Sequence, residues 1–372
     1  MESVRARIRS FLDRLVTAGA ASAAVAGRVG EGEPEVLGAA AIPGLAAAPS
    51  DIRFDLASLT KPFTATLALL LDAAGELLLD CELGELWPET APALAHCRLE
   101  DLLRHRSGLA PWIPLYQLVN GRGEARAEIL RGRWLHGEAE GRAVYSDLGY
   151  ILWGFAAERR TGRSLAELME QHVTVPWGLK TIRPLDAHFQ QNVLLSPMDT
   201  AKEVELAEGL GLRVPLQASP LEVVQEGVGE GLVQDGNARF LAGRSDGGAL
   251  GALSGHAGLF GSLGDVLTFG QAWLRAALGE PSAPMPRELV RRALSEPGAG
   301  KPTGWALGWA RQDDAGSSGP GLSSKAFGHP GFSGTSLWID PERREAYALL
   351  ATRNSPQEDF NRWRREFHQL VG

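Results

Sequence analysis

The stretch Phe54-Asp55-Leu56-Ala57-Ser58-Leu59-Thr60-Lys61-Pro62-Phe63 stands where strand-like sequence changes into a long, mostly apolar helix, which we predict over Leu56 to Gly75. Pro62 is compatible with this helix, because proline is tolerated in a first helical turn. Ser58 and Lys61 are three residues apart, so their side chains lie on one face of a helix and can meet. The stretch therefore combines a candidate nucleophile with a candidate base.

A serine hydroxyl is a weak nucleophile and needs a neighbouring base. Lys61 can act as that base only when it is partly neutral, and burial beside Phe54, Leu56 and Phe63 is expected to push its pKa down. The free N–H groups at the helix start could hold a developing oxyanion at Ser58. A lone Ser-x-x-Lys is weak evidence, since Ser58 could simply cap the helix and Lys61 could be solvated. Lysine is scarce in this arginine-rich chain, which favours the catalytic interpretation.

The composition is that of a globular chain with a sizeable core. The chain has 372 residues with 44% hydrophobic content, enough for one catalytic unit made of two lobes. Its formal net charge is −8 and its basic residues are scattered, so nucleic acid is a poor candidate partner. Cys81 and Cys97 have no neighbours at metal-ligand spacing, and we expect two buried free thiols rather than a zinc site or a disulfide.

The N-terminal segment superficially resembles a signal peptide. Leu15 to Ala26 is fairly apolar, but it consists mainly of Ala and Gly, and Asp13 and Arg14 precede it. An amphipathic helix followed by a strand fits better, so we expect a cytoplasmic rather than a periplasmic location. No run approaches the roughly 20 apolar residues of a membrane span.

Strand-like segments occur at both ends of the chain and helical segments lie between them. Periodicity predicts an N-terminal helix with a buried face at Val4, Ile8, Phe11, Leu12 and Leu15. Further helices are expected over Leu99–His105, Ser146–Thr161, Ser164–His172, Ser262–Leu274 and Phe360–Leu370. Strands are expected over Ala23–Val29, Glu35–Ala41, Trp305–Arg311, Ala326–His329, Thr335–Ile339 and Ala346–Thr352. This order indicates a split α/β sheet domain with an inserted helical domain; residues 186–251 remain unassigned.

Two further motifs carry candidate functional groups. Tyr145-Ser146-Asp147 lies at the start of a predicted helix. A tyrosine with a lowered pKa could shuttle a proton, although a tyrosine before a helix is, taken alone, more often a packing residue. Gly328-His329-Pro330-Gly331-Phe332 lies in strand-like sequence. His329 could be a charged or donor group facing the pocket, or a structural histidine. Gly331 would allow close backbone approach to a substrate, and the Phe332 N–H could be an oxyanion donor.

The order of these motifs resembles that of the class C β-lactamases, the DD-peptidases (penicillin-binding proteins) and the carboxylesterases of the same fold. Their motifs are Ser-x-x-Lys, Tyr-x-Asn and Lys/His-x-Gly, in that order. Accessory stretches are similar too: Leu102 to Leu109, Tyr145 to Tyr150, Gly255 to Phe260 and Gly328 to Trp338. The resemblance runs from about Phe54 to Asn354. It implies an α/β (α+β) fold, with an antiparallel sheet flanked by N- and C-terminal helices (1–62 plus 252–372) and an inserted, mainly helical domain (63–251).

The resemblance also implies roles for the matching residues. Ser58 would be acylated, Lys61 and Tyr145 would exchange its proton, and the backbone N–H groups of Ser58 and Phe332 would form the oxyanion hole. Asp147, His329 and Gly331 would bind substrate. No metal or organic cofactor is implied. His105 and His256 lie in family-like stretches, and we interpret both as structural.

Two departures from the family pattern bear on the substrate. Asp147 stands where β-lactamases usually have Asn, and a carboxylate only accepts hydrogen bonds and disfavours a substrate carboxylate. Pro330 stands where the family often has Thr, which removes a hydroxyl and a backbone N–H. Both changes favour a carboxylesterase acting on small neutral esters through an acyl-enzyme. The alternatives are a β-lactamase or D-Ala-type peptidase, which would act on an amide, or an inactive binding or sensor protein.

Overall fold

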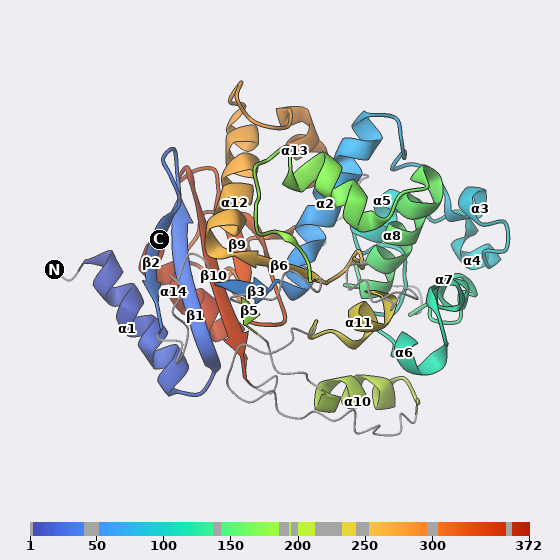
Figure 1. The fold of residues 1–372 in the computed structure, drawn as a ribbon, viewed down its shortest axis with the longest axis horizontal. Helices are drawn as coiled ribbons and strands as arrows, with labels where there is room; N and C mark the ends of the chain where they lie inside the picture. Colours follow the sequence, from blue (N-terminus) through green and yellow to red (C-terminus); the bar gives the residue numbers. More distant parts are fainter. Residues whose placement is uncertain are drawn as a thin grey trace.

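The computed structural model describes most of the chain and places its elements in two connected parts (Figure 1). The described residues are 3–40, 52–136, 143–185, 193–194, 200–212, 233–242, 253–295, 304–354 and 359–372. Among them, no helix is long and apolar enough to cross a membrane.

One part is a six-stranded antiparallel sheet in the order β2-β1-β10-β9-β8-β7, which joins the two ends of the chain. Its strands are β1 (Ala21–Val29), β2 (Glu35–Ala39), β7 (Ala310–Arg311), β8 (Phe327–Pro330), β9 (Ser336–Asp340) and β10 (Glu345–Arg353). The early strand β1 pairs with the late strand β10, with Val25 opposite Leu350. The sheet can therefore form only when the two ends of the chain come together.

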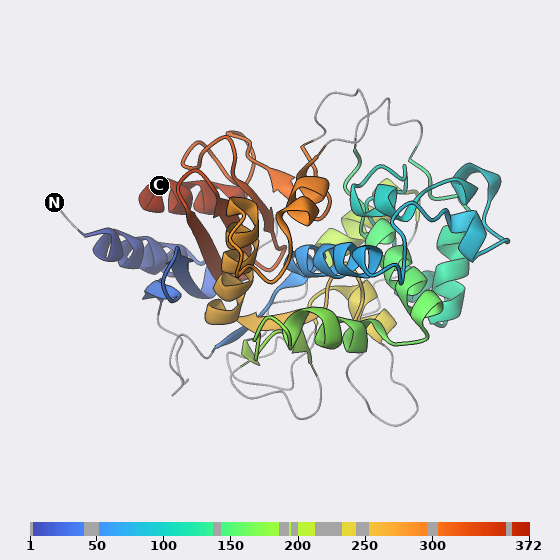
Figure 2. The same cartoon turned by 90° about the horizontal axis from the view of Figure 1, so that it is seen from above.

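The two faces of this sheet are both covered by helices (Figure 2). Alternate residues of a strand point to opposite faces, so both faces must be apolar. Ala24 and Leu349 pack with α1 (Val4–Thr17) and α14 (Asn361–Val371) on one face. Val25 and Leu350 belong to the larger core on the other face, where α12 (Leu263–Leu278) lies.

A smaller four-stranded sheet lies between the main sheet and the helical part. Its order is β4-β6-β3-β5, with β4 (Arg183–Pro184), β6 (Leu259–Ser262), β3 (Arg53–Asp55) and β5 (Val193–Leu194). Strand β3 leads into the 3₁₀ turn η2 (Ala57–Leu59) and then into α2 (Thr60–Ala73). This connection places Ser58 and Lys61 at the junction of the two parts.

The helical part surrounds α2, which is buried along most of its length. Its helices are α3 (Leu83–Leu86), α4 (Pro92–Ala95), α5 (Leu99–Leu103), α6 (Leu115–Leu118), α7 (Arg122–Leu130), α8 (Asp147–Thr161), α9 (Leu165–Met169), η3 (Glu170–Thr174), α10 (Thr200–Gly209), α11 (Gly236–Ala242) and α13 (Arg287–Leu294). Helix α8 packs on α5 and begins where the sequence predicts, because the Ser146 side chain caps it.

Most of the predicted elements are confirmed, with a few corrections. The hairpin of β1 and β2, the terminal helices and the last three strands are present. The predicted strand Trp305–Arg311 is wrong, because only Ala310–Arg311 forms a strand there. The predicted helix at Leu56 opens as a 3₁₀ turn. Cys81 and Cys97 are free, but they are half-buried rather than buried. Residues 186–251 lie largely outside the described residues, and the domain boundaries remain a prediction.

Gly328 supplies a test of the close packing between β8 and β9. A Cβ at this position would lie 2.3 Å from Cδ2 of Trp338 and 2.4 Å from the Leu337 carbonyl oxygen. We therefore expect Gly328→Ala to lower the free energy of unfolding by about 1–3 kcal/mol. Gly264, near the start of α12, has no atom within 4 Å of its Cβ position and is the matched control. Gly264→Ala should be neutral or stabilising in the same denaturant titration; an equal loss in both variants would contradict the packing argument.

Candidate active site

The turn that carries Ser58 is held by a buried carboxylate. Ala57, directly before Ser58, has a φ of 46°, which is uncommon for a residue other than glycine. Its N–H donates to Oδ1 of Asp55 at 2.8 Å, while the Gln234 N–H donates to Oδ2 of Asp55 at 2.8 Å. Asp55 is 1% exposed, and burial raises its pKa to about 6. A strained backbone immediately before the candidate nucleophile is thus secured from two sides.

Lys61 is completely buried and has three close oxygen partners. Its Nζ lies 2.9 Å from Oγ of Ser58, 2.7 Å from Oδ1 of Asp147 and 3.2 Å from the backbone oxygen of His256. The Ser58 and His256 oxygens accept hydrogen bonds from Nζ, and the Asp147 carboxylate supplies the opposite charge. The predicted contact between Ser58 and Lys61 is therefore present in the structure.

The expected lowering of the Lys61 pKa is wrong. Burial does act to lower it, as the sequence predicted, but the Asp147 carboxylate and Tyr145 outweigh burial and raise the pKa of Lys61 above its ordinary value. An opposite charge in direct contact favours the ammonium form. The resting site therefore contains an Asp147–Lys61 ion pair rather than a neutral amine.

Tyr145 lies beside the same group, with the Lys61 Nζ 4.9 Å from the centre of its ring. The ring of His105 packs against it, with the ring centres 4.5 Å apart, and Nδ1 of His105 accepts a hydrogen bond from the Ser146 N–H at 3.0 Å. The expected lowering of the Tyr145 pKa is also wrong, because burial raises the pKa more than Lys61 lowers it. Tyr145 is therefore a protonated phenol at rest.

His329 is a neutral acceptor rather than the charged or donor group that the sequence suggested. Its Nδ1 lies 2.8 Å from the Pro330 carbonyl oxygen, which can only accept, so Nδ1 carries the proton. Nε2 then has a lone pair and no hydrogen-bond partner among the described residues. Burial, with the nearby Lys61 charge, lowers the pKa of His329 to about 3. His329 therefore offers neither a positive charge nor an N–H donor at Nε2 to an anionic substrate group.

These groups line a pocket of about 410 Å³. Ser58, Tyr145, Asp147, His329, Gly331 and Phe332 all contribute to its wall, so the predicted residues that face a substrate converge on one cavity. Further carboxylates come from Glu203 and Asp235, and guanidinium groups from Arg353 and Arg364. The pocket therefore contains both acidic and basic side chains.

Gly331 lies so close to other parts of the chain that a side chain would not fit there. A Cβ there would lie 2.0 Å from Oγ1 of Thr335 and 2.6 Å from the Leu56 carbonyl oxygen. Gly331 thus allows β8 to approach the segment that leads to Ser58, whereas the sequence argument assigned the close approach to a substrate. Phe332, whose N–H is the candidate second oxyanion donor, is 37% exposed at the pocket.

Asp147, Asp235 and His256 form the cluster that could in principle hold a metal ion, since one ligand atom of each lies within 4.8 Å of the others among the described residues. Both carboxylates of this cluster already have partners. Asp147 pairs with Lys61, and Nε2 of His256 lies 2.9 Å from Oδ1 of Asp235. A cation added there would face the Lys61 ammonium, so the arrangement suits a buried lysine better than a metal.

Asp55 and Asp235 are the residues that the sequence interpretation missed. Asp55 precedes Ser58 by three residues, but no periodic pattern marks it as a buried ligand of the backbone. Asp235 lies in the segment that could not be assigned. Its one local signal is that of a helix cap, because its Oδ1 accepts from the Ala238 N–H at 2.7 Å at the start of α11.

Comparison with known proteins identifies the family to which this fold belongs. The family model described as Beta-lactamase matches residues 8–370. The chain belongs to the beta-lactamase family. It is 26% identical over 332 residues to the N-acetylmuramyl-L-alanine amidase of Bacillus subtilis, covering 83% of this chain and 70% of that protein. It is 28% identical over 341 residues to Esterase EstB of Burkholderia gladioli, covering 84% of this chain and 79% of that protein.

The fold is shared with solved members of the same group. A penicillin-binding protein homologue from Caulobacter crescentus superimposes with a TM-score of 0.72 at 17% identity, covering 100% of this chain and 97% of that one. The fold class inferred from the motifs is therefore confirmed. Within the beta-lactamase family, the protein is a serine hydrolase of this fold.

The Asp147–Lys61 ion pair predicts an alkaline pH dependence. Lys61 must lose its proton before it can accept that of Ser58, and Asp147 raises the pKa of Lys61. The acylation rate should therefore rise as the pH increases from neutral into the alkaline range. Asp147→Asn removes the carboxylate, so the acid limb of kcat/KM against pH should move to lower pH. Asp147→Glu, which keeps the charge, is the control. An acid limb that stays in place in Asp147→Asn would show that Asp147 does not set the protonation of Lys61.

Proposed function

We propose that the protein is a carboxylesterase that hydrolyses small neutral esters through an acyl-enzyme on Ser58. The observation that carries this proposal is the neutral, accepting His329 beside the Asp147–Lys61 ion pair. The side chains nearest Ser58 then offer no uncompensated positive charge to a substrate carboxylate. A neutral ester requires no such positive charge in order to bind. Esterase EstB is a relative whose name states this activity.

In the proposed acylation, Lys61 in its neutral form takes the hydroxyl proton of Ser58 while Oγ attacks the ester carbonyl carbon. The carbonyl π electrons move to oxygen, and the resulting oxyanion accepts hydrogen bonds from the backbone N–H groups of Ser58 and Phe332. When the tetrahedral intermediate collapses, the C–O bond to the alcohol breaks. The leaving oxygen takes a proton from Lys61, directly or through the Tyr145 hydroxyl.

In the proposed deacylation, water attacks the acyl carbonyl carbon and gives its proton to the same base. The intermediate collapses, the bond from the carbonyl carbon to Oγ breaks, and Oγ of Ser58 regains a proton. The acid product and the free enzyme result. Tyr145 lies beside both Lys61 and the Ser58 hydroxyl, which each lower its pKa, so it is placed to pass a proton in either step.

A second candidate function is that of a β-lactamase or D-Ala-type peptidase. Arg353 and Arg364 favour it, because both line the pocket and could face a substrate carboxylate. Arg364 already donates to the Gly331 carbonyl oxygen and to the Thr335 carbonyl oxygen at 3.1 Å. The Arg353 guanidinium stacks over the Phe332 ring, 5.0 Å from its centre.

A substrate panel with the nucleophile removed separates these functions. The wild-type protein should hydrolyse short-chain aryl esters with a higher kcat/KM than a chromogenic cephalosporin, and it should release little D-alanine from a D-Ala-D-Ala peptide. Ser58→Ala should lose about 10⁴-fold or more of the esterase kcat. Fast cephalosporin turnover or D-alanine release without ester hydrolysis would overturn the esterase proposal. Stable acylation of Ser58 without turnover, read by intact mass, would indicate a binding protein instead.

A further inference from the structure

The backbone carbonyl of His256 is the acceptor that completes the surroundings of Lys61. A neutral amine has two N–H donors and one lone pair. The His256 oxygen is an acceptor only, so it takes one N–H group, and the other N–H is favoured on the side of the Asp147 carboxylate, whose Oδ1 lies 2.7 Å away. The lone pair then faces the hydroxyl-bearing side of the site, where Ser58 lies 2.9 Å away. The position of the His256 carbonyl therefore sets the direction in which Lys61 can accept a proton.

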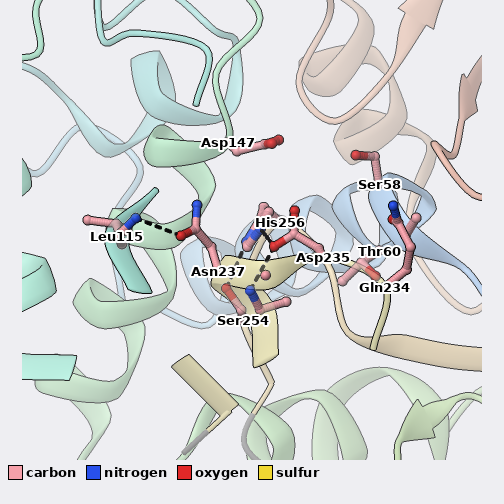
Figure 3. A network of polar contacts seen from close by, with 12 residues as sticks. Ser58, Thr60, Leu115, Asp147, Gln234, Asp235, Asn237, Ser254 and His256 are labelled. Atoms are coloured by element: carbon pink, nitrogen blue, oxygen red, sulfur yellow. Dashed lines mark hydrogen bonds and ion pairs between the residues drawn. The ribbon is translucent and has the colours of Figure 1, made fainter. Parts of the chain in front are cut away.

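The side chain of His256 is held at both ring nitrogens (Figure 3). The ring is buried, with 1% exposure; Nε2 lies 2.9 Å from Oδ1 of Asp235 and Nδ1 lies 2.8 Å from Oγ of Ser254. Because a carboxylate can only accept, Nε2 carries the proton and the Ser254 hydroxyl donates to Nδ1. A single tautomer satisfies both bonds, and the ring cannot turn without breaking one of them.

The neighbouring backbone is also constrained, and the His256 ring adds to the constraint on the peptide that follows it. The Thr64 hydroxyl of α2 donates to the Gly255 carbonyl oxygen at 2.8 Å. A Cβ on Gly255 would lie 2.2 Å from the Tyr150 carbonyl oxygen of α8, so the turn is pressed between these two helices. The Ala257 N–H, which belongs to the same peptide as the His256 carbonyl, donates to the Ser254 carbonyl oxygen at 3.3 Å. The orientation of the His256 carbonyl therefore depends on this backbone bond together with the anchored His256 ring.

Asp235 connects this anchor to the rest of the site. Its side chain is 19% exposed and lines the pocket, while its Oδ1 accepts from both the His256 ring and the Ala238 N–H. The preceding residue, Gln234, donates its N–H to Asp55, which holds the turn of Ser58. One short segment at the start of α11 thus contacts the turn of Ser58 through Asp55 and the turn beside Lys61 through His256.

We propose that Ser254, His256 and Asp235 form a positioning unit for Lys61, acting through the backbone carbonyl of His256. They are positioning residues rather than catalytic ones, because they act on Lys61 and transfer no proton themselves. The inference rests on the proposed role of Ser58 as nucleophile. It replaces the interpretation of His256 as a structural histidine.

The test compares the reactivity of Ser58 in variants of this unit. A fluorophosphonate probe reports the activation of Ser58 whatever the natural substrate is, and an aryl ester gives kcat and KM. His256→Ala should lower the second-order rate of probe labelling and the kcat by about 10- to 100-fold, because the base is misdirected. KM should change little, since His256 does not line the pocket among the described residues. Asp235→Asn keeps an accepting oxygen for Nε2–H and should retain most of the labelling rate, whereas Asp235→Ala should not.

His368→Ala is the matched control. His368 is equally buried and donates from Nδ1 to the Ser318 carbonyl oxygen, but it lies on α14 and outside the pocket wall. Its variant should label at the wild-type rate. If His256→Ala does not fold, as judged by thermal unfolding, Ser254→Ala provides the same comparison with a smaller change. The positioning role is overturned if His256→Ala or Ser254→Ala labels as fast as the wild type, or if only KM rises.

The same measurements separate this inference from the proposed function. A wild-type protein that reacts with the probe but hydrolyses no ester would refute the esterase proposal and leave the labelling comparison intact. A wild-type Ser58 that fails to react with the probe would refute both.

Discussion

The burial of the Lys61 charge is the constraint on which the site depends. An ammonium group with no exposure to solvent is costly unless its donors are paired and an opposite charge is near. Here Asp147 supplies the charge, and Ser58 and the His256 carbonyl supply the remaining acceptors. These groups come from the start of α8, the turn before α2 and the turn before β6. The lysine can therefore be accommodated only when the helical part and the small sheet have come together.

The same ion pair creates a conflict between stability and reactivity. Asp147 offsets the cost of burying Lys61, but it also favours the protonated form, which cannot accept a proton from Ser58. An Asn at this position, as β-lactamases usually have, would relieve that effect while keeping an accepting oxygen. The carboxylate therefore gives this chain a better compensated resting site and, in the acylation proposed here, a base that would work at higher pH. The neutral state of His329 also depends on Lys61, because burial and the Lys61 charge both oppose the protonation of His329.

The sequence was a good guide to local features and a poor one to interactions between distant segments. Ser58, Lys61, Tyr145 and His329 could be found because each lies in a short motif, and α8 could be placed because Ser146 caps it. The pKa directions of Lys61 and Tyr145 could not be predicted, since they depend on which charges the fold brings together. Burial considered alone predicted the wrong direction for the pKa shift of Lys61. Asp235 was missed for the same reason, because its partner His256 lies 21 residues further along the chain.

The two buried or half-buried aspartates explain why a strained nucleophile and a buried base can coexist in one small region. Asp55 accepts hydrogen bonds from the backbone N–H groups of two pocket-lining residues, Ala57 and Gln234, and burial raises its pKa because those two donors only partly replace water. Asp235, the next residue along from Gln234, then orients the ring of His256. A displacement of this dipeptide would therefore disturb Ser58 and Lys61 at the same time.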